Sequence, residues 1–377
     1  MTALRFGRRE PVIGIDASRI GVTHRTGTET YTWETLKAMA DLAPDAPVRL
    51  YFNGSSNLFP YAPAWQKRSI PFPKLWTHQR LSAEMAQHPP SLLWVPAHVI
   101  PINHPKSVVT VHDLGYLHRP EGHTDRQRRM LDWTTRWSCH AASAIIAISK
   151  STRMDLIERY GVSPEKISVI PHGVGAQYVR ADDASVADIR RRYSLERPFV
   201  LAVGTLQPRK NYDGLARSLK LAEPELGDIE LVIAGKSGWM ADDVRAAIDQ
   251  SGFAAKVKLL DYVPDADLPA LYSAAEVVAF PSWYEGFGLP ALEAMSCGTP
   301  VVASKRGSLP EVVGPGGIIV DPEDESAMGA AIVRVVTDSF HRADLVERGQ
   351  EQAARYSWRQ TARATLDLLT KQADIPG

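Results

Sequence analysis

The chain has 377 residues, of which 44% are hydrophobic and 23% are charged, a balance typical of a soluble globular protein with sizeable cores. This length suggests two domains of ordinary size. The 43 basic and 43 acidic residues cancel to a formal net charge of zero. A general nucleic-acid binder needs an overall basic surface, so no nucleic-acid partner is expected.

The N-terminus, MTALRFGRREP, is basic, but no apolar segment follows it, so no secretory signal is expected. No run approaches the roughly 18 apolar residues of a membrane-spanning helix. Cys139 and Cys297 lie far apart and have no metal-ligand spacing, which is typical of free thiols in a reducing compartment. We therefore expect a cytoplasmic protein, and association with the inner membrane surface stays open.

Short apolar, β-branched runs recur along the chain, and most are separated by segments with helical character. Such runs are typical of parallel strands that are buried on both faces. The predicted strands are 12–16, 48–52, 92–95, 107–111, 144–148 and 167–170, followed by 199–203, 230–234, 257–260, 276–280, 300–303 and 317–320. The predicted helices include 29–42, 125–142, 151–160 and 323–336. Strands that alternate with helices indicate an α/β protein with doubly wound parallel sheets.

The strand pattern occurs twice, and the break falls at residues 173–198, which are polar and contain no predicted strand. We predict two Rossmann-like domains, residues 1–176 and 177–356, that face each other across a cleft. A last helix within 357–377 is expected to pack back on the first domain. Because ligands of open parallel sheets bind beyond the carboxyl ends of the strands, the chemistry should lie in the loops that follow strands.

The motif GTLQPRKN, residues 204–211, follows a predicted strand and leads into a helix. Gly204 permits a tight turn, and Arg209 and Lys210 stand just before the predicted helix start. A helix N-terminus together with two cations is a physical site for a diphosphate. A capped helix with two solvated charges is the structural alternative.

The motif PSWYEGFGLPALEAMSCG carries two glutamates, Glu285 in a glycine-rich loop and Glu293 in the predicted first turn of the next helix. A carboxylate can accept hydrogen bonds from two neighbouring hydroxyls, so each glutamate could hold a sugar ring. Gly286 and Gly288 let the backbone approach a ligand, and N–H groups near Gly288 and Leu289 can donate to it. A loop surface charge and a favourable charge at a helix N-terminus are the alternatives.

Two further motifs also follow predicted strands. His112 begins HDLGYL directly after one strand, at the position where parallel sheets place catalytic groups, although a His–Asp pair could equally cap a loop. PHGVG, residues 171–175, is interpreted as a structural turn that closes the first domain.

A glycine-centred loop precedes the first predicted helix, within residues 23–39. Thr28 is expected to cap this helix, and Gly27 to let the loop close over a phosphate or a sugar, which makes both candidate donor-binding residues. Asp265 and Asp267 form a D-x-D, which we interpret as helix caps and not as a metal site. No other metal-ligand cluster occurs, so no metal is expected.

The segment 123–142 is a predicted basic helix that also carries tryptophans. The residues concerned are Arg126, Arg128, Arg129, Arg136, Trp133 and Trp137. A basic amphipathic helix can lie on an anionic membrane surface. An ordinary surface helix with one packed face is the alternative, and both interpretations stay open.

Together these motifs resemble the family-4 retaining glycosyltransferases of the GT-B fold, over almost the whole chain. The resemblance also rests on AISKSTRMDL (147–156), on LYSAAEVVAFPSWYEGFGLPALEAMSCGTPVVAS and on the closing YSWRQTA (356–362). Two glutamates separated by seven residues are specific for this family when they follow such a strand. The resemblance implies that Arg209 and Lys210 bind the donor diphosphate. Some relatives carry an arginine directly after Gly204, where this chain has Thr205.

The resemblance further implies that Glu293 holds the nucleoside ribose and that Glu285 contacts the donor sugar. It places His112 near the anomeric centre and Val263 beside the base. The backbone residues that it sets next to the sugar are Phe287, Gly288 and Leu289.

The implied reaction is glycosyl transfer with retention of configuration, by same-face attack that the leaving phosphate assists, without a metal or other cofactor. The wording of GTLQPRKN and HDLGYLHRPE is most similar to bacterial mannosyl- and rhamnosyltransferases of polysaccharide assembly. We therefore expect GDP-mannose as donor and a glycan or lipid-linked glycan as acceptor. The alternatives are an epimerase or phosphorylase of the same fold and a non-catalytic nucleotide-sugar-binding protein. A nicotinamide-dependent oxidoreductase is disfavoured, since no G-x-G-x-x-G follows the first strand.

Overall fold

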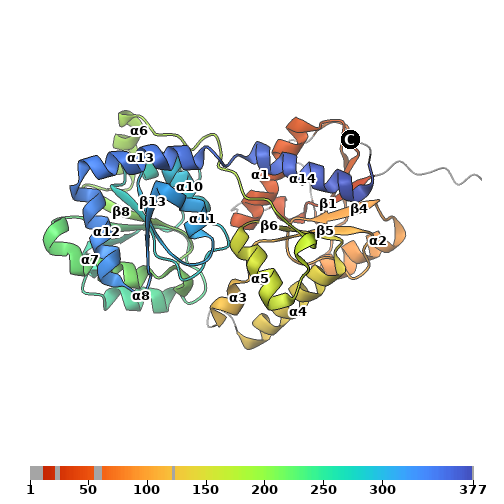
Figure 1. Cartoon of the computed structure of the whole chain (residues 1–377), viewed down its shortest axis with the longest axis horizontal. Helices are drawn as coiled ribbons and strands as arrows, with labels where there is room; N and C mark the ends of the chain where they lie inside the picture. The colour runs from red at the N-terminus through yellow and green to blue at the C-terminus, as the bar shows by residue number, and fades with distance from the viewer. Residues whose placement is uncertain (1–11, 22–25, 55–61, 121–123, 376–377) are drawn as a thin grey trace, which may run out of the picture.

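The structure is a computed structural model that describes residues 12–21, 26–54, 62–120 and 124–375. Two α/β domains lie side by side, each built on one parallel sheet (Figure 1). The N-terminal segment 1–11, residues 23–25 of the glycine-centred loop and His123 of the basic helix lie outside the described residues.

The first sheet has seven strands in the order β3-β2-β1-β4-β5-β6-β7, all parallel. They are β1 Ile13–Asp16, β2 Val48–Phe52, β3 Gln66–Ser69, β4 Leu92–Val95, β5 Ser107–Val111, β6 Ala144–Ala147 and β7 Ile167–Val169. Its helices are α1 Gly27–Leu42, α2 Ser82–Gln87, α3 Gly115–His118, α4 Asp125–Ala141 and α5 Lys150–Tyr160. The sequence predicted six of these strands. The seventh, β3, reads QKRS, lies at the sheet edge and buries little, so it lacks the apolar signal of the others.

The second sheet has six parallel strands in the order β10-β9-β8-β11-β12-β13. They are β8 Phe199–Val203, β9 Glu230–Ala234, β10 Val257–Leu259, β11 Val277–Phe280, β12 Val301–Ser304 and β13 Gly317–Val320. Its helices are α6 Asp183–Arg192, α7 Tyr212–Leu226, α8 Ala241–Asp249, α9 Leu268–Ala274, α10 Leu289–Ser296, α11 Leu309–Val313, α12 Glu325–Thr337 and α13 Ser339–Ala353. This arrangement confirms the predicted fold class of two doubly wound parallel sheets.

The last helix, α14 (Trp358–Ala373), lies against α1 of the first domain (Figure 1). Its buried side chains, among them Leu366 and Leu369, join the core that contains Leu36 of α1. Two connecting segments run side by side between the domains, because the Val174 N–H donates to the Tyr356 carbonyl at 3.3 Å. The chain therefore passes between the domains at two adjacent points.

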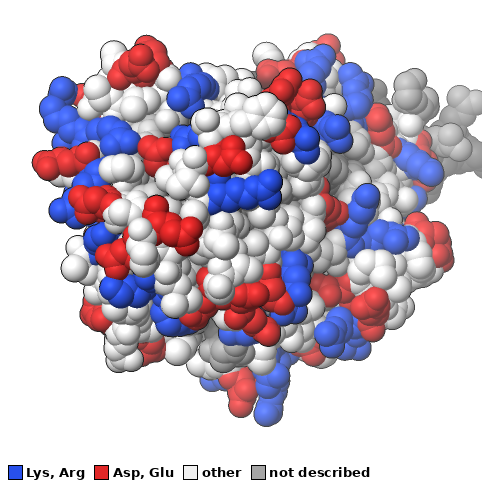
Figure 2. Space-filling model, turned by 60° about the vertical axis from the view of Figure 1, so that its left-hand side comes forward, with Lys and Arg blue, Asp and Glu red and all other residues white. Residues whose placement is uncertain are grey.

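Charges of both signs are interspersed over the face shown in Figure 2. Cys139 and Cys297 are buried free thiols. Within the described part of the chain, no helix is long and apolar enough to cross a membrane.

Candidate active site

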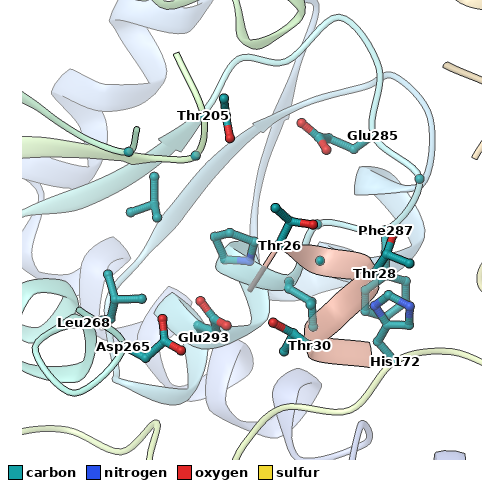
Figure 3. Close-up of a pocket in the computed structure, with 18 of the residues that line it drawn as sticks. Thr26, Thr28, Thr30, His172, Thr205, Asp265, Leu268, Glu285, Phe287 and Glu293 are labelled. Carbon is teal, nitrogen blue, oxygen red and sulfur yellow. The ribbon is translucent and has the colours of Figure 1, made fainter. Parts of the chain in front are cut away.

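A cavity of about 510 Å³ lies where the carboxyl ends of the two sheets face each other (Figure 3). Every site residue predicted from the sequence lines it. These are Gly27, Thr28, His112, Gly204, Thr205, Arg209, Lys210, Val263, Glu285, Phe287, Gly288, Leu289 and Glu293. The structure thus brings together residues up to 266 positions apart in the sequence, from Gly27 at the start of α1 to Glu293 in α10. Their individual roles stay predictions.

At one end of the cavity, Glu285 forms ion pairs with both cations of the GTLQPRKN loop. Lys210 Nζ lies 2.7 Å from Glu285 Oε1, and Arg209 Nη1 lies 3.1 Å from Glu285 Oε2. Arg209 Nη1 also donates to the Tyr284 carbonyl at 2.6 Å. The two loops follow β8 and β11, which are neighbours in the sheet, so their ends meet at one edge. Pairing therefore fixes both cations next to the carboxylate before any ligand arrives.

The electrostatics of this cluster favour an ionised carboxylate. Burial alone would raise the pKa of Glu285, but Arg209 and Lys210 lower it to about 2. Burial lowers the pKa of Lys210, an effect that Glu285 opposes. Across the cavity, the Asp113 carboxylate accepts from the Gly115 N–H at 2.8 Å. The guanidinium and the ammonium retain donors that Glu285 does not use, which suits an anionic ligand.

The geometry of this cluster requires a glycine at position 204. Its φ of +145° lies where side chains are rarely accommodated, and an added Cβ would stand 3.0 Å from Lys210 Nζ. The glycine therefore leaves room for the lysine to reach Glu285.

Glu293 lies at the other end of the cavity, beside Asp265 and Leu268 (Figure 3). Its Oε2 accepts from the Tyr272 hydroxyl at 2.8 Å, and burial raises its pKa to about 7. The sequence placed Glu293 in the first turn of its helix. In the structure α10 begins at Leu289, and Glu293 comes one residue after that turn, so burial and not the helix end governs its charge.

His112 directly follows β5 and is buried. Its Nε2 lies 2.9 Å from the Pro96 carbonyl, which can only accept, so Nε2 carries the proton and Nδ1 is left as an acceptor. Burial lowers the pKa of the ring, which keeps it neutral. A Cβ on Gly286 would lie 2.2 Å from the His112 carbonyl oxygen. The loops that carry His112 and Glu285 are therefore in direct contact across the two domains.

Two cap predictions are wrong. Helix α1 is preceded by Thr26, whose backbone N–H donates to the Glu29 side chain at 3.1 Å, while Thr28 lies inside the helix and lines the cavity. Asp267 precedes α9 but makes no capping bond, because its carboxylate accepts from Arg192 and from the Tyr193 hydroxyl. These long-range partners, 75 and 74 residues away, leave no signal in the local sequence.

Several residues that line the cavity were not predicted from the sequence, and His172 and Asp265 are among the polar ones. His172 was interpreted as part of a structural turn, but its buried ring lines the cavity and stacks on Tyr31 at 4.8 Å between centroids. Neither ring nitrogen has a hydrogen-bond partner among the described residues. Asp265 was interpreted as a cap. The sequence signal available for Asp265 was its position in the loop that follows β10.

In the described residues no cluster of three metal-ligating side chains occurs.

The basic helix α4 has one packed face and one exposed face. Thr134, Ser138 and Cys139 are buried, and Trp137 packs against the core next to them. On the other face, Trp133 is 67% exposed and Met130 is 55% exposed. The structure thus shows a helix with one packed face, and contact of its exposed face with a membrane stays a prediction.

Comparisons with known proteins agree with this geometry. A model of "Glycosyltransferase Family 4" matches residues 25–178, and one of "Glycosyl transferases group 1" matches residues 187–352. O-antigen chain mannosyltransferase B of Escherichia coli is 34% identical over 264 residues, which cover 70% of this chain and 69% of that protein. This chain belongs to the family-4 glycosyltransferases. It is therefore a glycosyltransferase, which favours the transferase over the epimerase, phosphorylase and silent-binder alternatives.

Other relatives of this glycosyltransferase are matched over less of their length. D-inositol 3-phosphate glycosyltransferase of Salinispora tropica is 37% identical over 60% of this chain and 50% of that protein. The serotype-specific mannosyltransferase WbdA of Escherichia coli is 30% identical over 61% of this chain and 29% of that protein. Sucrose-phosphate synthase from Thermosynechococcus elongatus superimposes with a TM-score of 0.76 at 22% identity, over 96% of this chain and 98% of that one. Anabaena HepE in complex with UDP-glucose superimposes with a TM-score of 0.75 at 21% identity, over 95% and 99%. These structures support the GT-B fold.

Proposed function

We propose that this enzyme transfers mannose from GDP-mannose to a glycan or lipid-linked glycan, with retention of configuration and without a metal. The observation that carries the proposal is the pairing of Glu285 with both Arg209 and Lys210, at the opposite end of one cavity from Glu293. Two cations at one end suit a diphosphate, and a carboxylate at the other end suits the hydroxyls of a ribose, which together support a nucleoside diphosphate sugar as ligand. Two of the relatives named above are mannosyltransferases, which favours mannose.

In this proposal the diphosphate lies on Arg209 and Lys210. Departure of GDP develops negative charge on the phosphate, and two fixed cations stabilise that charge without reorganising. Arg209 contributes a planar fork of donors and Lys210 a point charge. Because these two side chains supply the positive charge, the reaction needs no metal, and activity is expected to persist in a chelator.

The nucleoside end of the cavity is lined by two carboxylates. Glu293 would accept from the two ribose hydroxyls. Asp265 lines the same end and is exposed, so it can meet the base. Guanine presents two adjacent N–H donors on one edge, which a carboxylate accepts together, whereas uracil presents a single N–H there. Asp265 therefore supports GDP over UDP.

The sugar is proposed to lie between Glu285 and His112. Glu285 would accept from its hydroxyls, and His112 Nδ1 would accept from a hydroxyl near the anomeric carbon. Glu285 is already held by two cations, so we assign it to binding and not to nucleophilic attack. The acceptor hydroxyl then attacks from the face that the diphosphate leaves, its proton passes to the leaving phosphate, and the configuration is retained.

A lipid-linked acceptor would bring the enzyme to an anionic membrane through the exposed face of α4. Trp133 and Met130 can enter the headgroup region, and the exposed Arg126 and Arg129 can meet lipid phosphates. Flotation with phosphatidylglycerol vesicles tests this contact: Trp133→Ser should lower the bound fraction. The matched control is Trp239→Ser in the second domain, where Trp239 is 52% exposed. Equal binding by both variants and the unaltered protein would refute the membrane contact.

Thermal shift with GDP, UDP, ADP and dTDP tests the nucleotide, since a ligand of the native state raises the melting temperature. GDP should give the largest shift. Turnover of GDP-mannose, measured as GDP release and mannosylated product with a lipid-linked glycan acceptor, tests the sugar. A larger shift with UDP and turnover of UDP-glucose instead would contradict the donor proposal. Loss of turnover in Glu285→Gln with nucleotide binding retained would assign the glutamate to the sugar.

A further inference from the structure

Helix α5 belongs to the first domain but contacts the catalytic loops of both domains. The hydroxyl of Thr152 donates to the His112 carbonyl at 3.3 Å. One turn later, Asp155 Oδ2 accepts from the Tyr284 hydroxyl at 2.5 Å. Thr152 and Asp155 are three residues apart and so lie on one face of the helix. One rigid surface thus touches the residue next to Glu285 and the main chain of His112.

Tyr284 is fixed at three points. Its hydroxyl is held by the buried Asp155, and its ring stacks on His118, with centroids 4.2 Å apart and planes 15° apart. His118 Nε2 lies 2.8 Å from Asp155 Oδ1, so the imidazole and the phenol share one carboxylate. The carbonyl of Tyr284 accepts from Arg209 at 2.6 Å. Tyr284 therefore contacts the first domain through its side chain and orients Arg209, the cation proposed to bind the diphosphate, through its carbonyl.

A second connection leads from α5 to the same loop. The carboxylate of Glu311, on α11, accepts from the Lys150 N–H at the start of α5, with oxygens at 2.9 and 3.1 Å. Ser308, which directly precedes α11, donates from its N–H and from its hydroxyl to the Glu285 carbonyl, each at 3.0 Å. The Glu285 loop is thus tied to α5 on both sides.

We propose that Asp155, His118 and Tyr284 are positioning residues for glycosyl transfer, which hold Glu285 and Arg209 in register with His112 across the domain boundary. None of the three lines the cavity. Their effect is on geometry: a displacement of about 1 Å at reacting groups can cost about 10²-fold in rate. The inference rests on the transferase activity and deepens the proposed function, but it does not depend on which nucleotide sugar is the donor.

The test compares Tyr284→Phe with Tyr193→Phe. Each substitution removes one hydroxyl that donates to a carboxylate, but the Tyr193 bond to Asp267 at 2.8 Å lies within the second domain, and neither of its residues lines the cavity. For Tyr284→Phe we expect kcat to fall by about 10- to 100-fold while the affinity for GDP changes less than about twofold, because the GDP contacts lie within the second domain. Tyr193→Phe should leave both unchanged.

His118 supplies a rescue experiment. His118→Ala removes the donor to Asp155 and the stacking surface, and should lower kcat as Tyr284→Phe does. His118→Gln keeps an N–H donor and should restore part of kcat, which a purely packing role would not predict.

A Tyr284→Phe variant with the kcat of Tyr193→Phe would overturn the proposal. So would a parallel loss of kcat, GDP affinity and melting temperature, since that pattern reports general destabilisation. If another nucleotide sugar is turned over in place of GDP-mannose, only the donor proposal fails, and the same comparison is made with that sugar. Independently of any donor, a crystal structure of Tyr284→Phe should show the Glu285 carboxylate displaced, together with Arg209, relative to His112. An unmoved carboxylate would overturn the proposal.

Discussion

Glu293→Gln is expected to make the protein more stable and the nucleotide site weaker. The substitution keeps the shape of the side chain and an oxygen that can accept from Tyr272, but it removes the charge. A carboxyl whose pKa is about 7 in the fold and 4.5 in the unfolded chain costs the folded state about 3 kcal/mol once the pH is well above 7. The penalty follows from burial, and in the proposed function it keeps an acceptor ready for the ribose.

The sign follows from the direction of the pKa change. Because the folded-state pKa is raised, the protonated form favours folding, and this contribution is lost as the pH rises through about 7. Glu293→Gln should therefore exceed the unaltered protein in free energy of unfolding at about pH 8, by up to about 3 kcal/mol, and by less than about 1 kcal/mol near pH 5. Urea denaturation at both pH values measures this, with the exposed Glu347→Gln as control.

The affinity for GDP-mannose should fall in Glu293→Gln, while the stability of the protein rises. If the ionised carboxylate accepts from the two ribose hydroxyls as proposed, GDP-mannose affinity should fall about tenfold or more in Glu293→Gln. It should also fall for the unaltered protein as the pH drops below about 7. Isothermal titration with GDP-mannose measures both effects. A variant that is less stable at about pH 8, or that binds as tightly as the unaltered protein, would refute the reasoning.

Three further substitutions test the loops. Lys210→Met keeps the apolar stem but removes a cation from Glu285, and should lower kcat by about 10²- to 10³-fold in a GDP-release assay; a smaller change than fivefold would contradict its role. Gly286→Ala places a Cβ 2.2 Å from the His112 carbonyl oxygen. The substitution should lower the free energy of unfolding by about 1–3 kcal/mol in denaturant and should also lower kcat. A fully stable and active variant would show that the loops do not need this contact. Gly27→Ala meets nothing within 4 Å and should keep the melting temperature, yet lower GDP-mannose affinity if the backbone closes over the ligand; unchanged titration would remove Gly27 from the site.

Most strands were predictable because parallel strands buried on both faces leave continuous apolar runs. β8, β9 and β13 begin and end where the sequence predicted. β3 was missed because an edge strand can be polar and still pair, as Gln66–Ser69 does with β2. The local sequence therefore predicted the strands that form apolar runs, the edge strands β7, β10 and β13 included, and missed the polar edge strand β3.

The site residues that directly follow neighbouring strands could be predicted, because the carboxyl ends of such strands meet at one edge of the sheet. Arg209 and Glu285 follow strands that the fold makes neighbours, so their proximity follows from topology. The partners of Asp155 and Asp267 do not follow from any spacing, because Tyr284 and Arg192 lie 129 and 75 residues away from them in the sequence. His172 was missed for a related reason: its surroundings of Tyr31, Phe287 and Trp358 come from both domains and the last helix.

The most direct test of the central claim is a crystal structure of the enzyme with GDP-mannose bound. We expect the diphosphate on Arg209 and Lys210, the ribose hydroxyls on Glu293 and the mannose between Glu285 and His112. A diphosphate bound away from these two cations, with Glu285 still paired as in the free protein and no sugar beside it, would contradict the account.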